Sequence, residues 1–256
     1  MGFLACAGYT LVGAGPPAAI FYEFIVSSPF VLLVSLASAF FWVTVLLANS
    51  VVWRSLSWMT HQGQTEALRV LPLISFFATE ELLRPMVFRQ TKRATAALER
   101  RAVALRHPRL TKLERVRIFL GIGAGQGVAH SCLFFLNTVV TSYRGTYYNQ
   151  DTCPQMPYFL VAAISTCAMF MVLSFAMVLT SVVFESAQAG PTMSTSRGGD
   201  LRKLLPCALH AAAVLISFLN MAKGGCLVSS VLNALLVGAV VWMAARLVRD
   251  LARGVQ

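Results

Sequence analysis

The sequence predicts an all-α protein, a polytopic membrane bundle of seven transmembrane helices. Two observations lead to this prediction: apolar stretches of about twenty residues recur along the chain, and most basic residues lie between them. A helix of about 20 apolar residues is long enough to cross the ~30 Å hydrocarbon core of a bilayer. The chain is 57% hydrophobic and 12% charged, whereas soluble domains carry roughly 25% charged residues. Because neither a soluble domain nor an internal repeat is visible, residues 1–256 are expected to form a single transmembrane domain.

Each expected helix is placed by its apolar run. Lipid-embedded chain must satisfy its own backbone hydrogen bonds, which leaves helices or closed barrels, and continuous apolar runs do not show the alternation of barrel strands. The first run lacks a basic leader, so it is expected to be a retained helix and not a cleaved signal peptide. The third is the weakest, because acidic and basic residues and a proline interrupt it. The expected helices cover Phe3–Val26, Phe30–Trp53, Ala67–Phe88, Arg117–Val140, Tyr158–Phe184, Lys203–Met221 and Leu227–Leu247.

The basic residues also predict an orientation. Sixteen of the 21 Lys and Arg residues fall in or beside a long loop (residues 89–115), the loop after the fifth helix and the C-terminal tail (residues 248–256). The positive-inside rule places these segments in the cytosol, the N-terminus on the lumenal or extracellular side and the C-terminus in the cytosol. Within the long loop, Ala94–Leu105 is expected to form a short amphipathic helix. The net charge of +11 therefore predicts contact with anionic membrane lipids and not with nucleic acid.

The cysteines leave the question of disulfides open. Cys6, Cys153 and Cys226 fall near the expected lumenal side, where disulfides are permitted. The other three lie within expected helices, where a free cysteine behaves as a small packing residue. Spacing alone does not decide whether any pair is bridged.

The fourth expected helix carries small residues on two faces. Gly121 and Gly125 form one register, and Gly123, Gly127 and Ser131 form a second. Residues two apart point roughly 200° apart on a helix, so the two registers face nearly opposite directions. Glycine weakens a helix, but in a membrane small residues allow neighbouring helices to approach closely. The pattern favours packing within this chain's own bundle, with a face for a second protein as the alternative.

Ionisable residues within the expected helices form the second group of candidates. Charges at bilayer depth are costly and usually face the bundle interior, so they mark functional sites. Glu81 and Arg84 are three residues apart and can pair on one helix face, whereas Glu80 points about 100° away and needs another partner. His210 lies well inside the sixth expected helix. A lone buried histidine is more often a hydrogen-bonded residue than a metal ligand, and we expect His210, Glu81 and Arg84 to line a shared polar cavity.

Some of these ionisable residues also resemble part of an enzyme motif. The segment from Glu80 to Arg84 resembles the Glu-Glu-x-x-x-Arg motif of the type II prenyl-protein (CAAX) endopeptidases, with one spacer missing. Those enzymes use carboxylates and histidines in metal-assisted hydrolysis. Their pattern asks for Asn four residues after a histidine, where this chain has Val214 after His210, and Tyr158–Phe184 contains no histidine. We therefore expect no catalytic, cofactor-binding or metal-binding residues. The alternatives are an active intramembrane endopeptidase of this type and a small transporter or receptor.

Five blocks of sequence carry a resemblance to a known family. They are Ala7–Phe21 with its Gly-Pro break, Ser38–Trp42 with Ser50–Trp53, Glu81-Leu-Leu-Arg84, Gly123-x-x-x-Gly127 with Phe135-Leu-Asn137, and His210 with Phe218-Leu-Asn220. In order over almost the whole chain, these blocks resemble a non-catalytic family, the anterior pharynx-defective (Aph) subunits of γ-secretase, and the resemblance preserves the seven helices and the topology. A histidine that the family usually carries in the fifth helix is missing, with Ala176 or Met177 near its place, so the chain resembles a divergent member.

The resemblance implies a structural function. Aph subunits are scaffolds that hold nicastrin and presenilin together in an intramembrane aspartyl protease, whose aspartates belong to presenilin. It implies presenilin, nicastrin and presenilin-enhancer-type subunits as partners, a role in membrane-protein processing that includes Notch signalling, and residence in the endoplasmic reticulum, Golgi, plasma membrane and endosomes. It also implies helix packing or assembly as the role of the glycines and Ser131. Partner binding is implied for Glu80, Glu81, Arg84 and His210.

Overall fold

The computed structural model describes residues 2–59, 66–106, 110–142, 148, 153–188 and 198–253. All elements that it defines within these ranges are helices, as the sequence predicts. The chain divides into two compact units: unit 1 comprises Met1–Ala39 and Thr111–Gln256, and unit 2 comprises Phe40–Leu110.

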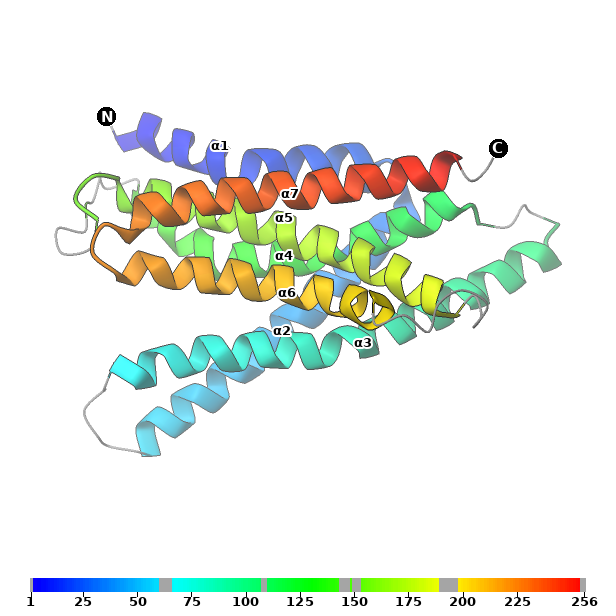
Figure 1. Ribbon diagram of the computed structural model, residues 1–256, viewed down its shortest axis with the longest axis horizontal. Helices are drawn as coiled ribbons and strands as arrows, with labels where there is room; N and C mark the ends of the chain where they lie inside the picture. The colour runs from blue at the N-terminus through cyan, green and yellow to red at the C-terminus, as the bar shows by residue number, and fades with distance from the viewer. Residues whose placement is uncertain are drawn as a thin grey trace. The chain divides into compact units, whose positions relative to one another are not determined.

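Unit 1 is a helical bundle built around one central helix. The central helix, α5, contacts α1, α4, α6 and α7, which run alongside it in Figure 1. Its apolar side chains form the core, where Val172, Leu173, Ala176 and Met177 are fully buried. A helix that is apolar on all sides is expected in such a central position. The helices span Gly2–Ile20 (α1), Lys112–Ser142 (α4), Tyr158–Gln188 (α5), Gly198–Phe218 (α6) and Gly225–Arg253 (α7).

The first helix changes its hydrogen-bonding register after two prolines. Pro16 and Pro17 lie inside α1, and the helix continues as a π-helix, η1, over Phe21–Val26. Proline has no backbone N–H, so both positions lose the bond to the residue four places earlier. The π-helix is rare and occurs mostly as a single turn inside a longer α-helix. The predicted span Phe3–Val26 is thus helical throughout but not regular.

A capping box starts α4. The backbone N–H and hydroxyl of Thr111 donate to Glu114 Oε2 over 2.6 and 2.9 Å, and the backbone N–H of Glu114 donates to Thr111 Oγ1 over 3.2 Å. This reciprocal arrangement satisfies N–H groups that a helix start leaves without intrahelical partners. The cap explains why α4 begins five residues before the apolar run that predicts it.

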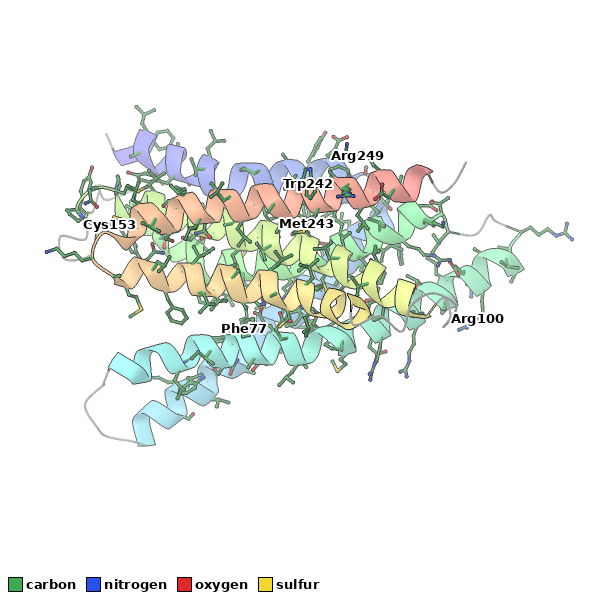
Figure 2. All side chains as sticks on the ribbon, in the orientation of Figure 1. Phe77, Arg100, Cys153, Trp242, Met243 and Arg249 are labelled. Atoms are coloured by element: carbon green, nitrogen blue, oxygen red, sulfur yellow. A yellow bond between two sulfur atoms is a disulfide. The ribbon has the colours of Figure 1, made fainter. Side chains whose placement is uncertain are left out.

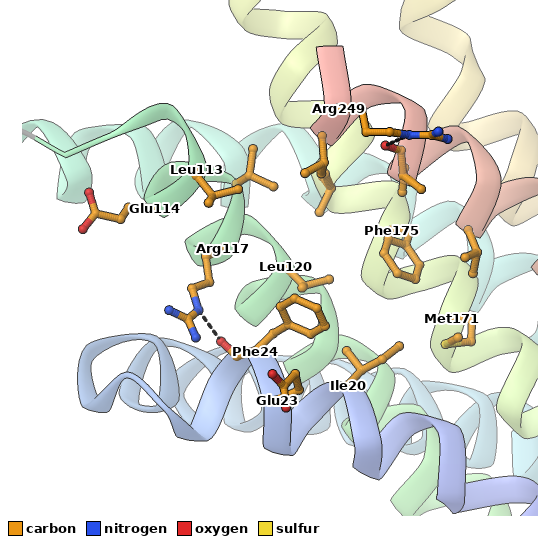
Figure 3. Close-up of a pocket in the computed structure, with 16 residues that line it drawn as sticks. Ile20, Glu23, Phe24, Leu113, Glu114, Arg117, Leu120, Met171, Phe175 and Arg249 are labelled. Carbon is orange, nitrogen blue, oxygen red and sulfur yellow. Dashed lines mark hydrogen bonds between the residues drawn. The ribbon is translucent and has the colours of Figure 1, made fainter. Parts of the chain in front are cut away.

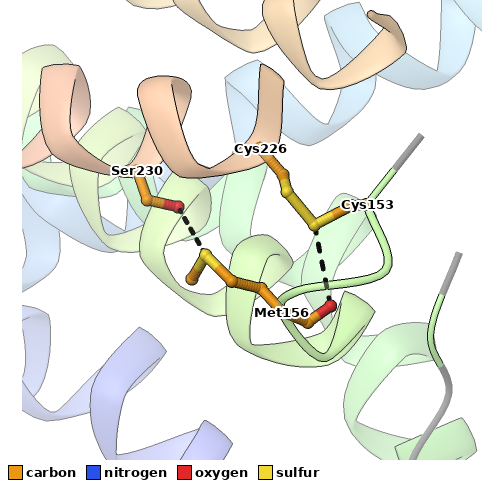
Figure 4. The surroundings of a disulfide bond; sticks show 4 residues. All are labelled: Cys153, Met156, Cys226 and Ser230. Atoms are coloured by element: carbon orange, nitrogen blue, oxygen red, sulfur yellow. Dashed lines mark hydrogen bonds between the residues drawn. A yellow bond between two sulfur atoms is a disulfide. The ribbon is translucent and has the colours of Figure 1, made fainter. Parts of the chain in front are cut away.

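A disulfide closes one end of unit 1. Cys153, just before α5, is bonded to Cys226 at the start of α7, with 5.9 Å between their α-carbons (Figure 4). Both cysteines are buried with Val161, and Met156 packs against them. Gly224 precedes α7 with a φ of +75°, a left-handed conformation that glycine adopts without strain. The bridge answers the question that the sequence left open, and Cys6 is a free thiol.

Unit 2 is formed by α3 and most of α2. Helix α2 spans Pro29–Met59 and enters unit 2 at Phe40, and α3 spans Glu66–Ala104. Two side-chain hydrogen bonds join them: Asn49 Nδ2 donates to Thr79 Oγ1 over 3.2 Å, and Trp53 Nε1 donates to Ser75 Oγ. Polar contacts between helices compensate for the weak hydrophobic drive for association in lipid.

Two sequence predictions about α3 need correction. The expected loop 89–115 is largely helical, and the expected short helix Ala94–Leu105 is the end of α3 and not a separate element. Residues 92–104 are rich in Ala, Leu, Arg and Glu, all strong helix formers, and no glycine or proline separates them from the preceding turn. Pro85 lies inside the helix without ending it.

Six helices of the described residues are long and apolar enough to cross a membrane, and α3 is not among them. The number of spans is therefore confirmed only as far as six, and a seventh crossing stays a prediction.

Helices α1 and α7 run in the same direction, so the N-terminal end of α1 and the C-terminal end of α7 lie at opposite ends of unit 1 (Figure 1). Figure 2 likewise places Cys153 and Arg249 at opposite ends. Which end faces the cytosol stays a prediction, which protease protection of terminal tags can test.

Candidate assembly site

The two small-residue registers of α4 pack against two different helices. A β-carbon built on Gly123 would lie 2.5 Å from the carbonyl oxygen of Ser174 and 2.8 Å from its α-carbon. One built on Gly127 would lie 2.6 Å from the ring of Phe170. Both neighbours belong to α5, so this register allows α4 and α5 to touch almost backbone to backbone. Real β-carbons do not approach other atoms this closely.

The opposite register faces the first part of α2. A β-carbon on Gly121 would lie 2.7 Å from Val31 Cγ1, and one on Gly125 would lie 2.8 Å from Ser38 Cβ and would also meet the carbonyl oxygen of Ser35. Ser38 then donates a buried hydrogen bond of 2.7 Å to the carbonyl oxygen of Ile122. The glycine faces thus contact this chain's own helices. A role in assembly stays a prediction for Gly121, Gly123, Gly125, Gly127 and the half-buried Ser131.

The charged group of α3 is buried in unit 2. Arg84 Nη2 lies 2.6 Å from Glu81 Oε1, so the two residues predicted to share a face form an ion pair. Arg84 is 4% exposed and Glu80 is 1% exposed, whereas Glu81 is only partly buried. The neighbouring glutamates therefore differ in environment, as their angular separation on the helix predicts. Buried ions of this kind are costly unless they are paired and hydrogen-bonded.

His210 lies in unit 1 on α6 and is 1% exposed. It follows Leu209, which packs with Ala213 and with Val172 of α5 in one apolar cluster. Ala176 and Met177, near the place of the missing histidine, are fully buried in α5, a helix that contacts α6. Since His210 belongs to unit 1 and the Glu81–Arg84 pair to unit 2, their shared cavity stays a prediction. Among the described residues, no cluster of three or more His, Cys, Asp or Glu residues could hold a metal ion.

Sequence reasoning missed several polar links that orient the helices. Arg117 Nε donates to the carbonyl oxygen of Phe24 over 2.6 Å, and its Nη2 donates to Ser27 Oγ. These bonds tie the start of α4 to η1. The sequence gives little indication of these hydrogen bonds, because Arg117 is one of many basic residues near the ends of the expected helices. It also does not reveal which backbone carbonyl group a π-helix leaves free to accept a bond.

The bundle of apolar helices, the glycine contacts and a few buried charged side chains define an integral membrane protein. The sequence profile of the family described as "Aph-1 protein" matches residues 4–250. The chain belongs to the Aph-1 family. It is 28% identical over 222 residues to a protein of Arabidopsis thaliana named "Gamma-secretase subunit APH1-like", covering 86% of this chain and 83% of that protein.

Proposed function

We propose that this chain is a non-catalytic scaffold subunit of a γ-secretase-type intramembrane aspartyl protease. Its partners are a presenilin, a nicastrin and a presenilin-enhancer-type subunit. The observation that carries the proposal is family membership over residues 4–250, together with the similarity to a γ-secretase subunit-like protein. The proposed compartments are the endoplasmic reticulum, Golgi, plasma membrane and endosomes, and the proposed process is membrane-protein processing that includes Notch signalling.

The packing of α4 supports a scaffold role. Gly123 and Gly127 hold α4 against α5, and Gly121 and Gly125 hold it against the first part of α2. A helix fixed on two sides places its neighbours in a defined geometry, which a subunit needs if it is to present surfaces to several partners. Large exposed apolar side chains on α1 supply such surfaces or face lipid, among them Leu4 and Leu11.

Co-isolation of a presenilin-like partner in mild detergent tests the proposal. We expect the wild-type chain to recover this partner and Gly123→Leu to recover much less, because leucine at this position forces α4 away from α5. Gly238→Leu on α7 is the matched control, since a β-carbon there meets no atom within 4 Å. Failure of the wild-type chain to recover any presenilin-like protein would contradict the proposal.

A proteolysis assay of the isolated chain tests the proposal that the chain is not catalytic. We expect no cleavage of a prenylated peptide, because Val214 stands where the metalloendopeptidase pattern requires asparagine. Stoichiometric zinc, with cleavage that is lost in Glu81→Gln, would support the alternative of an intramembrane endopeptidase.

A further inference from the structure

One exposed stripe on α3 changes from apolar to basic along the helix. Leu82 is 79% exposed and Met86 is 44% exposed, and the exposed Arg89 and Arg93 follow. The spacing i, i+4, i+7 and i+11 places these four positions within about 60° of one another on a helix of 3.6 residues per turn. Because α3 is helical from Glu66 to Ala104, the stripe is one continuous surface of unit 2.

The basic part of the stripe begins where the third expected span ends, at Phe88. With a rise of 1.5 Å per residue, Arg89 and Arg93 lie about 1.5–8 Å beyond Phe88 along the axis. Each polar layer of a bilayer is about 5–8 Å thick, which is half the difference between the whole membrane and its hydrocarbon core. On the predicted crossing of α3, Leu82 and Met86 therefore lie at the depth of acyl chains. Arg89 and Arg93 lie at the depth of the headgroups, in the leaflet that the predicted topology makes cytosolic.

The two arginines are not engaged by the fold, unlike the arginine near the start of α4. Arg117 donates to the carbonyl oxygen of Phe24 (Figure 3). Within the described part of the chain, Arg89 and Arg93 make no hydrogen bond or ion pair. The first acidic residue that follows them in the sequence is Glu99. Their guanidinium groups are therefore available to an anion outside the chain.

We infer that this stripe binds a lipid whose headgroup carries several phosphates, a polyphosphoinositide of the cytosolic leaflet. An acyl chain lies along Leu82 and Met86. The headgroup phosphates contact Arg89, Arg93 and Lys92, which is also exposed. Basic residues directly after the cytosolic end of a membrane helix attract anionic lipids in this way.

The spacing of the basic side chains favours a headgroup with more than one phosphate. Residues three and four apart on a helix have β-carbons about 5–6 Å apart, so Lys92 and Arg93 both lie beside Arg89. Neighbouring phosphates on one inositol ring are separated by a similar distance and can each meet a different side chain. Arginine also supplies the paired donors that suit phosphate oxygens. A headgroup with one net negative charge, such as phosphatidylserine, would neutralise only one of the three.

Native mass spectrometry of the purified full-length chain tests the inference, with phosphatidylinositol bisphosphate and phosphatidylserine of the same acyl composition as probes. We expect the bisphosphate to bind at least about tenfold more tightly. Arg89→Gln with Arg93→Gln should weaken its binding by about tenfold or more, as expected for the loss of charged hydrogen bonds. The matched control is Arg100→Gln with Arg101→Gln, which removes the same charge from exposed positions of the same helix. Arg100 lies about 18 Å beyond Phe88, outside the headgroup layer, so this control should bind the bisphosphate as the wild type does.

Two further measurements separate the stripe from net charge and from soluble phosphates. Arg93→Ala combined with Ala94→Arg keeps the charge but turns it by about 100° around α3, and residue 94 is exposed. This variant should bind the bisphosphate as weakly as Arg93→Ala alone, with the elution volume of the chain unchanged. Free inositol trisphosphate should bind at least about tenfold more weakly than the lipid, because it has no acyl chain to contact Leu82 and Met86.

Several outcomes would overturn the inference: equal binding of the two lipids, equal effects of the two paired variants, or full binding by the variant with the turned charge. Free inositol trisphosphate that bound as tightly as the lipid would show a site for soluble phosphates instead. If Arg89→Gln with Arg93→Gln kept lipid binding and lost recovery of a protein partner, the stripe would be a protein contact. None of these outcomes depends on the proposed scaffold function, which co-isolation tests separately.

Discussion

Different kinds of interaction stabilise the two units of this chain. In unit 1, α4 and α5 meet through Gly123 and Gly127, whose missing side chains allow close backbone contact, and a disulfide closes one end. In unit 2, α2 and α3 are joined by hydrogen bonds between side chains, and α3 buries an ion pair. The stability of unit 1 thus depends on close steric packing and on a covalent link. The stability of unit 2 depends on polar side chains that need hydrogen-bonding or charged partners.

This difference predicts how the units respond to substitution. Close packing fails by steric overlap, so the cost depends on whether the neighbouring atoms can move. Buried polar contacts fail by leaving one partner unsatisfied, so the cost depends on what remains and is reduced when both partners are replaced together. Single and paired substitutions should therefore separate the two units.

The largest effect is expected in unit 2 at Arg84. Replacing Arg84 with alanine leaves Glu81 without the cation that now lies 2.6 Å away, and breaking a buried pair in this way costs about 3–5 kcal/mol. Glu81→Gln combined with Arg84→Met removes both charges and should cost less than Arg84→Ala alone. Thermal unfolding of the detergent-solubilised chain measures both. A double variant less stable than Arg84→Ala would show that the pair is not the main contribution.

The second effect concerns the covalent link of unit 1. Cys153→Ser with Cys226→Ser opens a loop with a sequence separation of 73 residues, and loss of such a bridge costs about 2–4 kcal/mol. The same change should appear in the wild type after treatment with a reductant. Cys6→Ser, which alters a free thiol, is the control. Stability that does not change on reduction would argue against a structural role for the bridge.

The sequence predicts where the helices lie, but it predicts only some of the contacts between their side chains. All seven apolar runs fall within helices, because length and apolarity are local properties. The small-residue registers of α4 were readable because 3.6-residue periodicity places Gly121 and Gly123 on opposite faces. Their neighbours were not readable, since Ser35 and Ser174 carry no signal that marks them as contact points. The ion pair was predictable from its spacing of three, whereas the Cys153–Cys226 bridge and the long extension of α3 depend on distant or competing parts of the chain.

The third prediction tests steric packing in unit 1 with a change of one methyl group. Gly123→Ala places a β-carbon against the backbone of Ser174, which cannot rotate away, and should destabilise the chain by about 1–3 kcal/mol. Gly127→Ala meets the ring of Phe170, which can turn, so its cost should be smaller. Gly238→Ala has open space and should stabilise the chain by about 0.5–1 kcal/mol through helix propensity. Equal effects at Gly123 and Gly238 would refute close packing as the role of this register.

The smallest effect is expected at the hydrogen bond between α2 and α3. Thr79→Val keeps the shape of the side chain but removes the hydroxyl that accepts from Asn49 and donates to the carbonyl oxygen of Ser75 over 2.8 Å. A side-chain hydrogen bond between membrane helices contributes about 0.6 kcal/mol on average, so we expect a loss near that value. Asn49→Leu should cost a similar amount, and the double variant should cost less than the sum of the two, because each single change removes the same bond. The free energy of unfolding in mixed micelles gives the coupling between the two positions. Strictly additive losses would show that the hydrogen bond between Asn49 and Thr79 does not stabilise unit 2, which would weaken the contrast between the two units.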